Sequence, residues 1–409
     1  MKKTLISLAT ASLIASSAVA ADKGIDFTTT GQAVVYYQTA GQASDEIFDK
    51  DSSKANVGIQ LDLAADLKNG FGMGAQLSYL DAFGLNKNLV GDTNVMEVGG
   101  SVPSTQALGG TKTTDDLALT KIFLTKTIAK TTVKIGRQEL PKSLSPLAFS
   151  EGWNVFKNTF EAILVVNTDL PNTTLVGAYV GGSTGHNLSS FGDLTVNGSL
   201  EVNGAAYMLT AQNTALPMTT VTASYYALKK IDTALSADAI WLDAKIADKS
   251  LPMGLKVGLQ GGTIMPELSA LDDTVAFGLK AGVSPVKNLK VCTAFSTVND
   301  GTAKVVNTGT GKKTPLYTQL VANQGFISSD NSTFMLKGAY SLGDMGTVIA
   351  QGSYTKDNSD AEKDSTDLEL LYKTKVSGMN LLAAYVRTNT SDDKKAANNI
   401  VRVVARYAF

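Results

Sequence analysis

The stretch that decides the fold is VGIQLDLAADLKNGFGMGAQLSYL, residues 57–80. In its first arm, 57–67, every second residue is apolar, and the residues between are Gly, Gln, Ala and Asp. Asn69-Gly70 then predicts a tight turn, because both residues tolerate a positive φ. The alternation resumes over 71–79. Because alternate residues of a strand face opposite sides of a sheet, the two arms predict a hairpin with one continuous apolar face.

The same two-residue period recurs over most of the chain. Short turns near 169–172, 284–288 and 342–346 alternate with longer segments rich in Gly, Ser, Asn and Asp. This asymmetry is typical of outer-membrane β-barrels, whose turns are periplasmic and whose loops are extracellular. Strands are predicted near 25–37, 56–67, 71–81, 117–127, 132–138, 159–167, 173–181, 204–213, 219–228, 237–247, 253–263, 274–283, 289–297, 333–341, 347–354, 366–375, 380–388 and 399–409. Long loops are expected near 38–55, 82–116, 139–158, 182–203 and 298–332.

These segments predict an all-β fold, a transmembrane antiparallel β-barrel of about eighteen strands. An even number is required when both ends of a single-chain barrel lie on the periplasmic side. Sixteen is the alternative count, because Lys121, Lys126 and Arg137 interrupt the period in the two least regular segments. After residue 20 no run of about 18 apolar residues occurs, which excludes membrane-spanning helices.

The first twenty residues have the pattern of a secretory signal peptide. Lys2 and Lys3 precede an apolar run, and Ala18-Val19-Ala20 has the small residues of a cleavage site. We therefore expect residues 1–20 to be removed on export and residues 21–409 to form the barrel in the bacterial outer membrane. The alternative, an uncleaved membrane anchor, needs a longer apolar run.

Composition argues against several function classes. The formal net charge is −1 at pH 7, so the chain has no overall basic field for nucleic acid. The single Cys292 cannot form an internal disulfide, and no His and Cys spacing indicates zinc. Asp pairs at 115–116, 272–273 and 392–393 offer hard oxygen ligands for calcium, although such pairs are usually solvated loop charges. No cofactor is expected, and a metal site stays unassigned.

The chain ends on NNIVRVVARYAF, residues 398–409. Tyr407 and Phe409 continue an apolar parity, whereas Arg402 and Arg406 lie on the opposite parity. In a barrel the first set faces lipid and the second faces a wet lumen. We interpret Tyr407 and Phe409 as the anchor and assembly signal of the last strand.

Charged residues on the inward parity are candidates for the pore lining. The basic ones come mostly from the C-terminal half and form a predicted ladder: Lys256, Lys280, Lys290, Lys337, Lys373, Arg402 and Arg406. Acidic residues assigned to the same parity are Asp62, Asp66, Glu161, Asp367 and Glu369. Rings and ladders of charge select ions in pores, so a basic ladder opposite acidic groups would create a field across the channel. The alternative is that these are ordinary solvated charges.

Residues 139–158 are predicted to fold into the lumen as a constriction loop. They connect two strands and contain a cluster of Phe149, Trp153 and Phe156. A loop inside the barrel can pack these aromatic rings against the inner wall, whereas an extracellular loop would have to pack them on one another. The charged residues of this loop would then lie at the narrowest point: Glu139, Lys142, Glu151 and Lys157.

Three stretches resemble a known family: KIGRQEL…SPLAFSEGWNVFKNTFEA within 134–162, NTTLVGAYV at 172–180 and TTTGQAVVYYQT at 28–39. They are similar to the major outer-membrane porins of Campylobacter-type bacteria, and more distantly to the specific-channel porins of pseudomonads. The resemblance implies an eighteen-stranded barrel, usually trimeric, that passes small hydrophilic solutes and often favours cations. It also implies that Gly136-Arg137-Gln138 leads into the constriction. Calcium binds in the lumen of some relatives, but no ligand residues carry over to this sequence.

The predicted function is a porin, in which small hydrophilic solutes and ions diffuse passively through a water-filled barrel. Expected partners are these solutes, outer-membrane lipid and lipopolysaccharide, and further copies in a homotrimer. A substrate-specific channel is the alternative within this fold, and a surface adhesin is an alternative from another class. Single-channel conductance separates the three.

An enzyme is the rival that the sequence disfavours. A Ser-His-acid site would need the one histidine, His186, beside Ser183 or Ser189 at the membrane edge. His186 lies in a Gly, Ser and Asn-rich loop, which is typical of an exposed side chain. We therefore predict no enzymatic activity.

Overall fold

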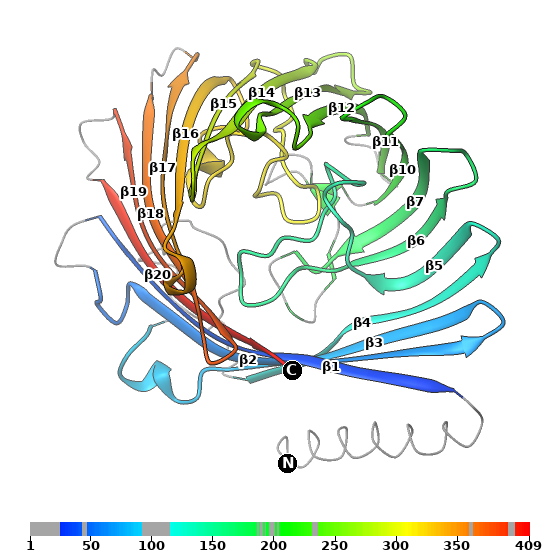
Figure 1. The fold of residues 1–409 in the computed structure, drawn as a ribbon, viewed down its shortest axis with the longest axis horizontal. Helices are drawn as coiled ribbons and strands as arrows, with labels where there is room; N and C mark the ends of the chain where they lie inside the picture. The colour runs from blue at the N-terminus through cyan, green and yellow to red at the C-terminus, as the bar shows by residue number, and fades with distance from the viewer. Residues whose placement is uncertain are drawn as a thin grey trace.

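The computed structural model describes residues 25–42, 47–91, 115–185, 188, 191–192, 194–195, 201–202, 204–230, 236–359, 363–391 and 397–409. Over these ranges the regular secondary structure is almost entirely β-strand, and the strands are arranged in a ring (Figure 1). The helices in these ranges are single short turns, η1 (Leu85–Lys87), η2 (Pro252–Gly254), η3 (Asn323–Gly325) and η4 (Gly343–Met345), none of them long and apolar enough to span a membrane. The predicted signal peptide, His186 and Asp392-Asp393 lie outside the described residues.

Eighteen strands form one antiparallel sheet, and the pairing of β1 with both β2 and β20 closes it. The predicted count of eighteen is therefore confirmed over sixteen. The strands are β1 (Asp26–Gly41), β2 (Ser53–Lys68), β3 (Phe71–Asp81), β4 (Asp115–Ile128), β5 (Thr131–Gln138), β6 (Phe160–Asn167), β7 (Thr173–Ser183), β10 (Gly204–Asn213), β11 (Thr219–Lys230), β12 (Ala237–Ala247), β13 (Lys256–Pro266), β14 (Thr274–Val286), β15 (Leu289–Val298), β16 (Asn331–Ser341), β17 (Thr347–Asp357), β18 (Ser365–Val376), β19 (Met379–Thr390) and β20 (Asn398–Ala408). A separate hairpin of β8 (Leu194–Thr195) and β9 (Glu201–Val202) lies in the segment between β7 and β10.

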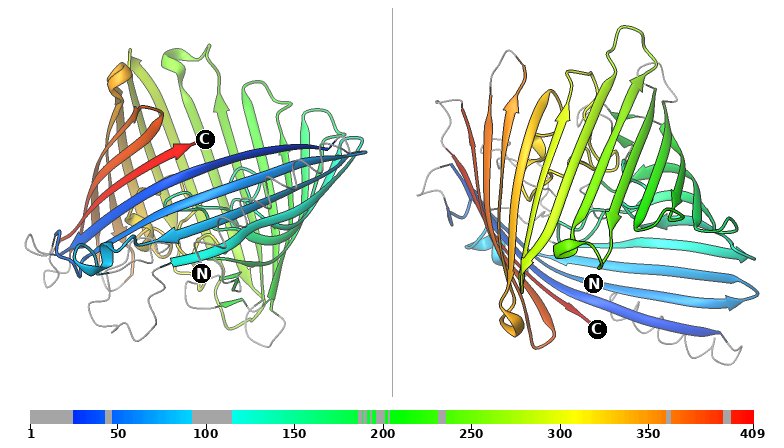
Figure 2. Two further views of the ribbon diagram at one scale, coloured as in Figure 1. Left: turned by 90° about the horizontal axis from the view of Figure 1, so that it is seen from below. Right: turned by 45° about the horizontal axis from the view of Figure 1, so that its top comes forward.

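Side chains alternate between the two faces of the wall as the sequence predicted. On β18, Leu368 and Leu370 are 56% and 53% exposed on the outside, whereas Glu369 between them is 4% exposed. The strands are inclined to the barrel axis (Figure 2), as closure of a sheet requires. An apolar outer face around a polar inner face is the arrangement of a barrel that has hydrocarbon outside.

The turn between β2 and β3 has the predicted geometry. Asn69 and Gly70 have φ values of 55° and 76°. A Cβ on Gly70 would lie 2.4 Å from the carbonyl oxygen of Thr127, so the neighbouring β4 also requires glycine there. Both the backbone conformation and this close approach therefore fix the residue type at the turn.

A β-bulge explains why β4 was irregular in sequence. The pairing with β3 shifts between Gln76 and Leu77, so that Thr120 is the extra residue on β4. A bulge turns the residues after it to the opposite face. As a result Lys121 contacts the inward Asp62, whereas Lys126 lies outside over the ring of Phe71, 3.8 Å from its centroid.

One acidic residue was assigned to the wrong face. Glu161 alternates with Phe160 and Ala162, which pack in the inner core, and it therefore points outward like Ile163. It forms an ion pair with Arg137 on β5 at 3.0 Å, and the Arg137 guanidinium stacks on Phe191 at 3.9 Å. The parity prediction failed here because the ion pair places two charged residues on the otherwise apolar face.

The first and last strands meet at the C-terminus. Gly31 on β1 and Phe409 exchange two backbone hydrogen bonds, of 2.7 and 3.0 Å. Tyr407 and Phe409 are 45% and 55% exposed, and their rings stack with centroids 6.4 Å apart. The predicted outward placement of both aromatic residues is confirmed. A Cβ on Gly31 would lie 2.5 Å from the Phe409 ring, so this position also requires glycine.

Two segments between strands lie inside the ring (Figure 1). The first is 139–158, after β5, as predicted. The second is 299–330, after β15, which differs from the prediction of an extracellular loop near 298–332. The correction has a physical basis, because apolar residues of the second segment pack on inward residues of the wall, among them Val321 on Ile349 and Leu371.

Candidate functional site

The segment 139–158, here called the inner loop, is attached to the wall by apolar side chains at both of its ends. Val155 and Phe156 pack with the inward residues Val34 and Tyr36 of β1 and Val404 of β20. At the other end, Leu140, Leu147 and Ala148 join the core formed by the inner faces of β6 to β15. The predicted use of apolar packing to hold this loop inside the barrel is therefore confirmed for Phe156.

Hydrogen bonds complete this attachment. The Arg406 guanidinium on β20 donates to the carbonyl oxygen of Val155 at 2.7 Å and to that of Asn154. On the far side, the Tyr226 hydroxyl accepts from the backbone N–H of Leu147 at 3.2 Å. The loop therefore crosses the lumen between β20 and β11.

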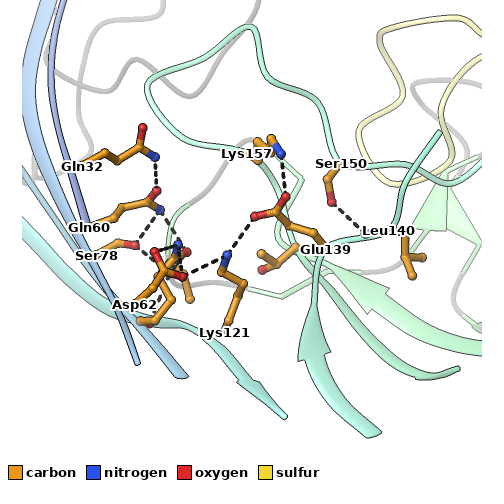
Figure 3. A network of polar contacts seen from close by, with 12 residues as sticks. Gln32, Gln60, Asp62, Ser78, Lys121, Glu139, Leu140, Ser150 and Lys157 are labelled. Carbon is orange, nitrogen blue, oxygen red and sulfur yellow. Dashed lines mark hydrogen bonds and ion pairs between the residues drawn. The ribbon is translucent and has the colours of Figure 1, made fainter. Parts of the chain in front are cut away.

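A chain of charges joins the inner loop to the wall (Figure 3). The Glu139 carboxylate accepts from Lys157 at 2.7 Å and from Lys121 at 2.9 Å, and Lys121 lies 3.2 Å from Asp62. Burial alone would raise the pKa of Glu139, but the ammonium groups of Lys157 and Lys121 outweigh it and hold that pKa below its usual value. Glu139 is therefore an anion at neutral pH.

A second chain, made of amides, covers the wall beside these charges. Gln32, Gln60 and Gln76 come from the neighbouring strands β1, β2 and β3. Gln32 donates to Gln60 at 2.5 Å, Gln60 donates to Gln76 at 3.1 Å, and Gln76 donates to Asp62 at 2.9 Å. These bonds orient the amides and leave a polar, uncharged surface on this part of the wall.

The inner loop and these strands enclose a polar cavity of about 340 Å³. Its lining combines the charge chain, the amide chain and the middle of the inner loop: Gln32, Gln60, Asp62, Gln76, Lys121, Glu139, Gly152, Phe156, Lys157 and Arg406. The opposing wall is thus β1 to β4 and β20. This differs from the prediction, in which the inner loop faces the whole basic ladder, because only Arg406 of that ladder contributes to the cavity.

The second segment, 299–330, is here called the plug segment. Its residues cover the inner wall from β15 to β20, where Leu320 packs on Ala294 and Met335. Glu369 on β18 accepts from the backbone N–H of Val321 at 2.6 Å and of Ala322 at 3.2 Å. The plug segment therefore occupies the part of the lumen between the ladder strands and the inner loop.

The two segments are bonded directly to each other. The Asn307 amide donates to Phe149 and Glu151 at 2.8 and 2.7 Å, and the Thr308 N–H donates to Leu147 at 2.7 Å. Glu151 also accepts from the Thr310 hydroxyl at 2.6 Å. Glu151 is 3% exposed, so this predicted constriction residue lies in the contact between the two segments and does not line the cavity.

Lys142 also lies away from the cavity. Its ammonium donates to the carbonyl oxygen of Thr314 in the plug segment at 3.1 Å and lies 4.9 Å from the Phe149 ring centroid. Of the four predicted constriction residues, Glu139 and Lys157 therefore come together at the cavity, and Lys142 and Glu151 join the two segments.

The remaining ladder residues face inward at different places on the wall. Lys280 lies over the ring of Tyr317 at 4.7 Å, and Tyr317 donates to Asp243 at 2.7 Å. Arg402 is 2% exposed and donates to Gln38 at 2.7 and 2.9 Å, so it serves as a buried contact. Four other ladder lysines are not among the residues that line the cavity: Lys256, Lys290, Lys337 and Lys373.

The described residues contain no group of three or more His, Cys, Asp or Glu side chains that could hold a metal ion. Calcium therefore has no assigned site in this part of the chain, and its binding stays a prediction. Ser183, one candidate for a hydrolase, is 2% exposed and its hydroxyl accepts from Gly185 at 3.1 Å.

Neither a protein-family model nor a curated protein matches the sequence. Solved structures do match over nearly the whole chain. Pseudomonas aeruginosa OccK8 (OprE) has a TM-score of 0.76 at 14% identity, covering 94% of this chain and 98% of its own. A BenF-like porin from Pseudomonas fluorescens has a TM-score of 0.72 at 13% identity, covering 94% and 98%. OpdK of P. aeruginosa with vanillate has a TM-score of 0.73 at 12% identity, covering 94% and 98%.

These similarities show the fold. They agree with the distant resemblance to pseudomonad channels, whereas the narrower resemblance to Campylobacter-type porins stays a prediction.

Proposed function

We propose that this chain forms a water-filled channel in the bacterial outer membrane, through which small hydrophilic solutes and ions diffuse passively. The observation that carries the proposal is the closed barrel with an apolar outside and a charged cavity beside an inserted loop. An apolar belt suits hydrocarbon, and eighteen strands enclose more space than their own side chains fill. Removal of residues 1–20 on export belongs to this proposal.

The fold-level similarity supports the same function. One matching structure is described as a porin and another as an outer membrane protein. Because one fold can serve several functions, the argument for a channel rests on the cavity and its charges, and the similarity adds to it. We infer no catalytic role for any residue.

In this proposal the narrowest part of the channel is the 340 Å³ cavity. Glu139, Asp62, Lys121, Lys157 and Arg406 would set its electrostatic field, and the amide chain would offer hydrogen bonds to passing solutes. The inward lysines of β13 to β18 would act away from this point, on solutes approaching or leaving it.

The test is the current through purified protein in a planar lipid bilayer. A general porin gives steady ohmic current in potassium chloride, and the reversal potential in a salt gradient gives the sign of its ion preference. A bilayer in which properly folded protein carries no current would contradict the proposal and favour an adhesin.

A substrate-specific channel is the second candidate, and the plug segment favours it. Two segments inside one barrel leave a narrower path than one, and a narrow path with fixed charges and amides can discriminate among solutes. OpdK, which has the same fold, was solved with vanillate. A specific channel would show low conductance that falls further when its solute is added, whereas a general porin would not.

We also propose that the C-terminal aromatic pair directs assembly and that the barrel works as a homotrimer in contact with lipopolysaccharide. Phe409 is paired to β1 and its ring is exposed on the outer face. Deleting Phe409 should therefore lower the yield of heat-resistant barrels on electrophoresis. A normal yield from the truncated chain would argue against this role.

A further inference from the structure

The middle of the inner loop is held from two opposite sides. Gly152 and Phe156 line the cavity, so the position of residues 151–157 sets its width. On one side Arg406 of β20 bonds to the carbonyl oxygen of Val155 at 2.7 Å. On the other side the plug segment bonds to Glu151, which directly precedes Gly152. Movement of the plug segment would therefore displace residues 151–157 and change the width of the cavity.

Lys313 is the centre of this second attachment. Its side chain is 1% exposed, and its backbone N–H donates to Glu151 at 3.3 Å. Its side-chain nitrogen Nζ donates to the carbonyl oxygen of Val321 at 2.7 Å and to Gln324 at 2.8 Å. The same nitrogen lies 5.0 Å from the ring centroid of Trp153. Lys313 therefore ties residues 313–324 of the plug segment together and supports the Trp153 ring of the inner loop.

Charged groups surround Lys313 on three elements. Glu151 lies on the inner loop, Asp367 and Glu369 on β18, and Arg402 on β20. Burial, helped by the charge of Arg402, lowers the pKa of Lys313 to about 7, although the three carboxyl groups oppose this shift. Lysine in water has a pKa of about 10.4, so Lys313 would take up a proton if it were released into the lumen.

We propose that Lys313 and Glu151 are positioning residues that latch the plug segment to the inner loop and thereby set the width of the channel. This inference rests on the proposed channel function. It gives the plug segment a role beyond filling space, because the segment becomes a second determinant of the opening. Solutes would meet the inner loop, but its position would depend on contacts that no solute touches.

The latch should respond to pH in one direction. Lys313 binds its proton more weakly when the plug segment is docked on the inner loop than when the segment is released. Falling pH therefore favours release of the plug segment. Between about pH 10 and pH 7, each unit of acidification can shift the balance toward release by up to about tenfold. Below about pH 7 both states are protonated, and the balance no longer changes with this group.

The experiment compares single-channel recordings of the full-length protein at pH 6 and pH 9. We expect steadier current at pH 9 and more frequent transitions between current levels at pH 6. Lys313→Met and Lys313→Arg remove the titration, so both should lose this difference, and Lys313→Arg should resemble the unmodified protein at pH 6. Lys312→Met is the matched control, because Lys312 is exposed and carries the same charge one residue away.

A second measurement separates the latch from the channel function. Backbone hydrogen exchange over 151–157 and 313–322 should be faster in Lys313→Met and Glu151→Gln than in Lys312→Met. If the unmodified barrel carries no current but these two variants still exchange faster than Lys312→Met, the latch is supported and the channel proposal fails. If the unmodified barrel conducts, and both Lys313 variants keep its pH dependence and its exchange rates, the latch is refuted. Heat-shifted mobility on electrophoresis identifies any variant that has not folded, in which case Glu151→Gln carries the test.

Discussion

The inner loop and the plug segment occupy the same lumen but are held there by different chemistry. The inner loop relies on large apolar side chains such as Val155 and Phe156, which are 0% and 2% exposed. The plug segment adds buried hydroxyl and amide groups to its apolar contacts, with Asn307, Thr314 and Thr318 all 0% exposed. Apolar packing needs only a complementary surface, whereas a buried polar group needs a partner at a defined distance. The plug segment therefore depends on the inner loop and the wall for its structure.

The largest expected effect comes from removing either segment. The backbone N–H of Asp330 donates to the carbonyl oxygen of Asn299 at 3.0 Å, so the ends of the segment lie close together. A short Gly-Ser linker can therefore replace 301–328 without straining β15 or β16. We expect the unit conductance to rise several-fold, and to rise less when 141–157 is replaced, because the plug segment is longer and supports the inner loop. Single-channel conductance measures this. An unchanged value after excision of 301–328 would mean that the plug segment lies outside the current path.

The next largest effect is on the free energy of unfolding, when one apolar and one polar contact of the two segments are removed in turn. Phe156→Ala should destabilise the barrel by about 3–5 kcal/mol, because it leaves a cavity against β1 and β20. Asn307→Ala should destabilise it by about 1–3 kcal/mol, because Glu151 and Phe149 lose donors. Guanidinium unfolding of the barrel in lipid vesicles gives both values. The reverse order would show that polar contacts are the stronger attachment.

A smaller effect should follow from Glu139→Gln. A charge at about 7 Å in water is worth about 0.6 kcal/mol, or about a threefold change in local ion concentration. We expect cation permeability relative to anion permeability to fall by about this factor, as measured by the reversal potential in a salt gradient. Glu151→Gln should change the ratio less, because Glu151 is 3% exposed between the segments and does not place its charge in the cavity. Equal shifts of the permeability ratio in both variants would contradict the placement of Glu139 at the cavity and of Glu151 away from it.

The pH dependence of selectivity follows from the same carboxylate. The pKa of Glu139 is held below its usual value by Lys157 and Lys121, although burial opposes them. Its negative charge should therefore persist from pH 8 down to pH 5 and be lost only at lower pH. A reversal potential that moves toward anion preference already between pH 7 and pH 6 would contradict the assigned ionisation.

The smallest expected effect tests the wall behind the plug segment. Cys292 is the one cysteine of the chain and lies on the inward face of β15, opposite Lys337. A negatively charged methanethiosulfonate reagent should lower the current slightly, and more strongly after excision of 301–328, which packs near this wall. Cys292→Ser should be unaffected by the reagent. A complete lack of labelling in the excised variant would place Cys292 away from water.

The sequence was sufficient for the wall because the membrane imposes a strict period on each strand. It failed at Glu161, where an ion pair with Arg137 overrides that period. For the inner loop, the aromatic cluster was a usable signal. The plug segment carried a weaker one, since Leu316, Leu320, Val321 and Ile327 are apolar residues that an extracellular loop does not need. Its attachment could not be predicted, because it depends on hydrogen bonds such as that between Asn307 and Glu151, which are 156 positions apart in the sequence.

The bulge at Thr120 explains why the site itself was only partly predicted. Simple alternation does not reveal which face Lys121 takes, and Lys121 is the residue that connects Glu139 to Asp62. Glu139 and Lys157 were identified from the loop alone, but their partner on the wall was not. Of the charged residues that interrupt the strand pattern, Lys121 therefore marks the bulge and an inward contact, whereas Lys126 and Arg137 face outward.

The pairing of Gly31 with Phe409 has a consequence for biosynthesis. The seam of the cylinder joins the two ends of the chain, so every nascent or truncated form has two open strand edges with unsatisfied N–H and C=O groups. Those edges invite pairing with other chains until β1 and β20 pair with each other. A cell that makes this protein must therefore shield the incomplete sheet until this closing pair of strands has formed.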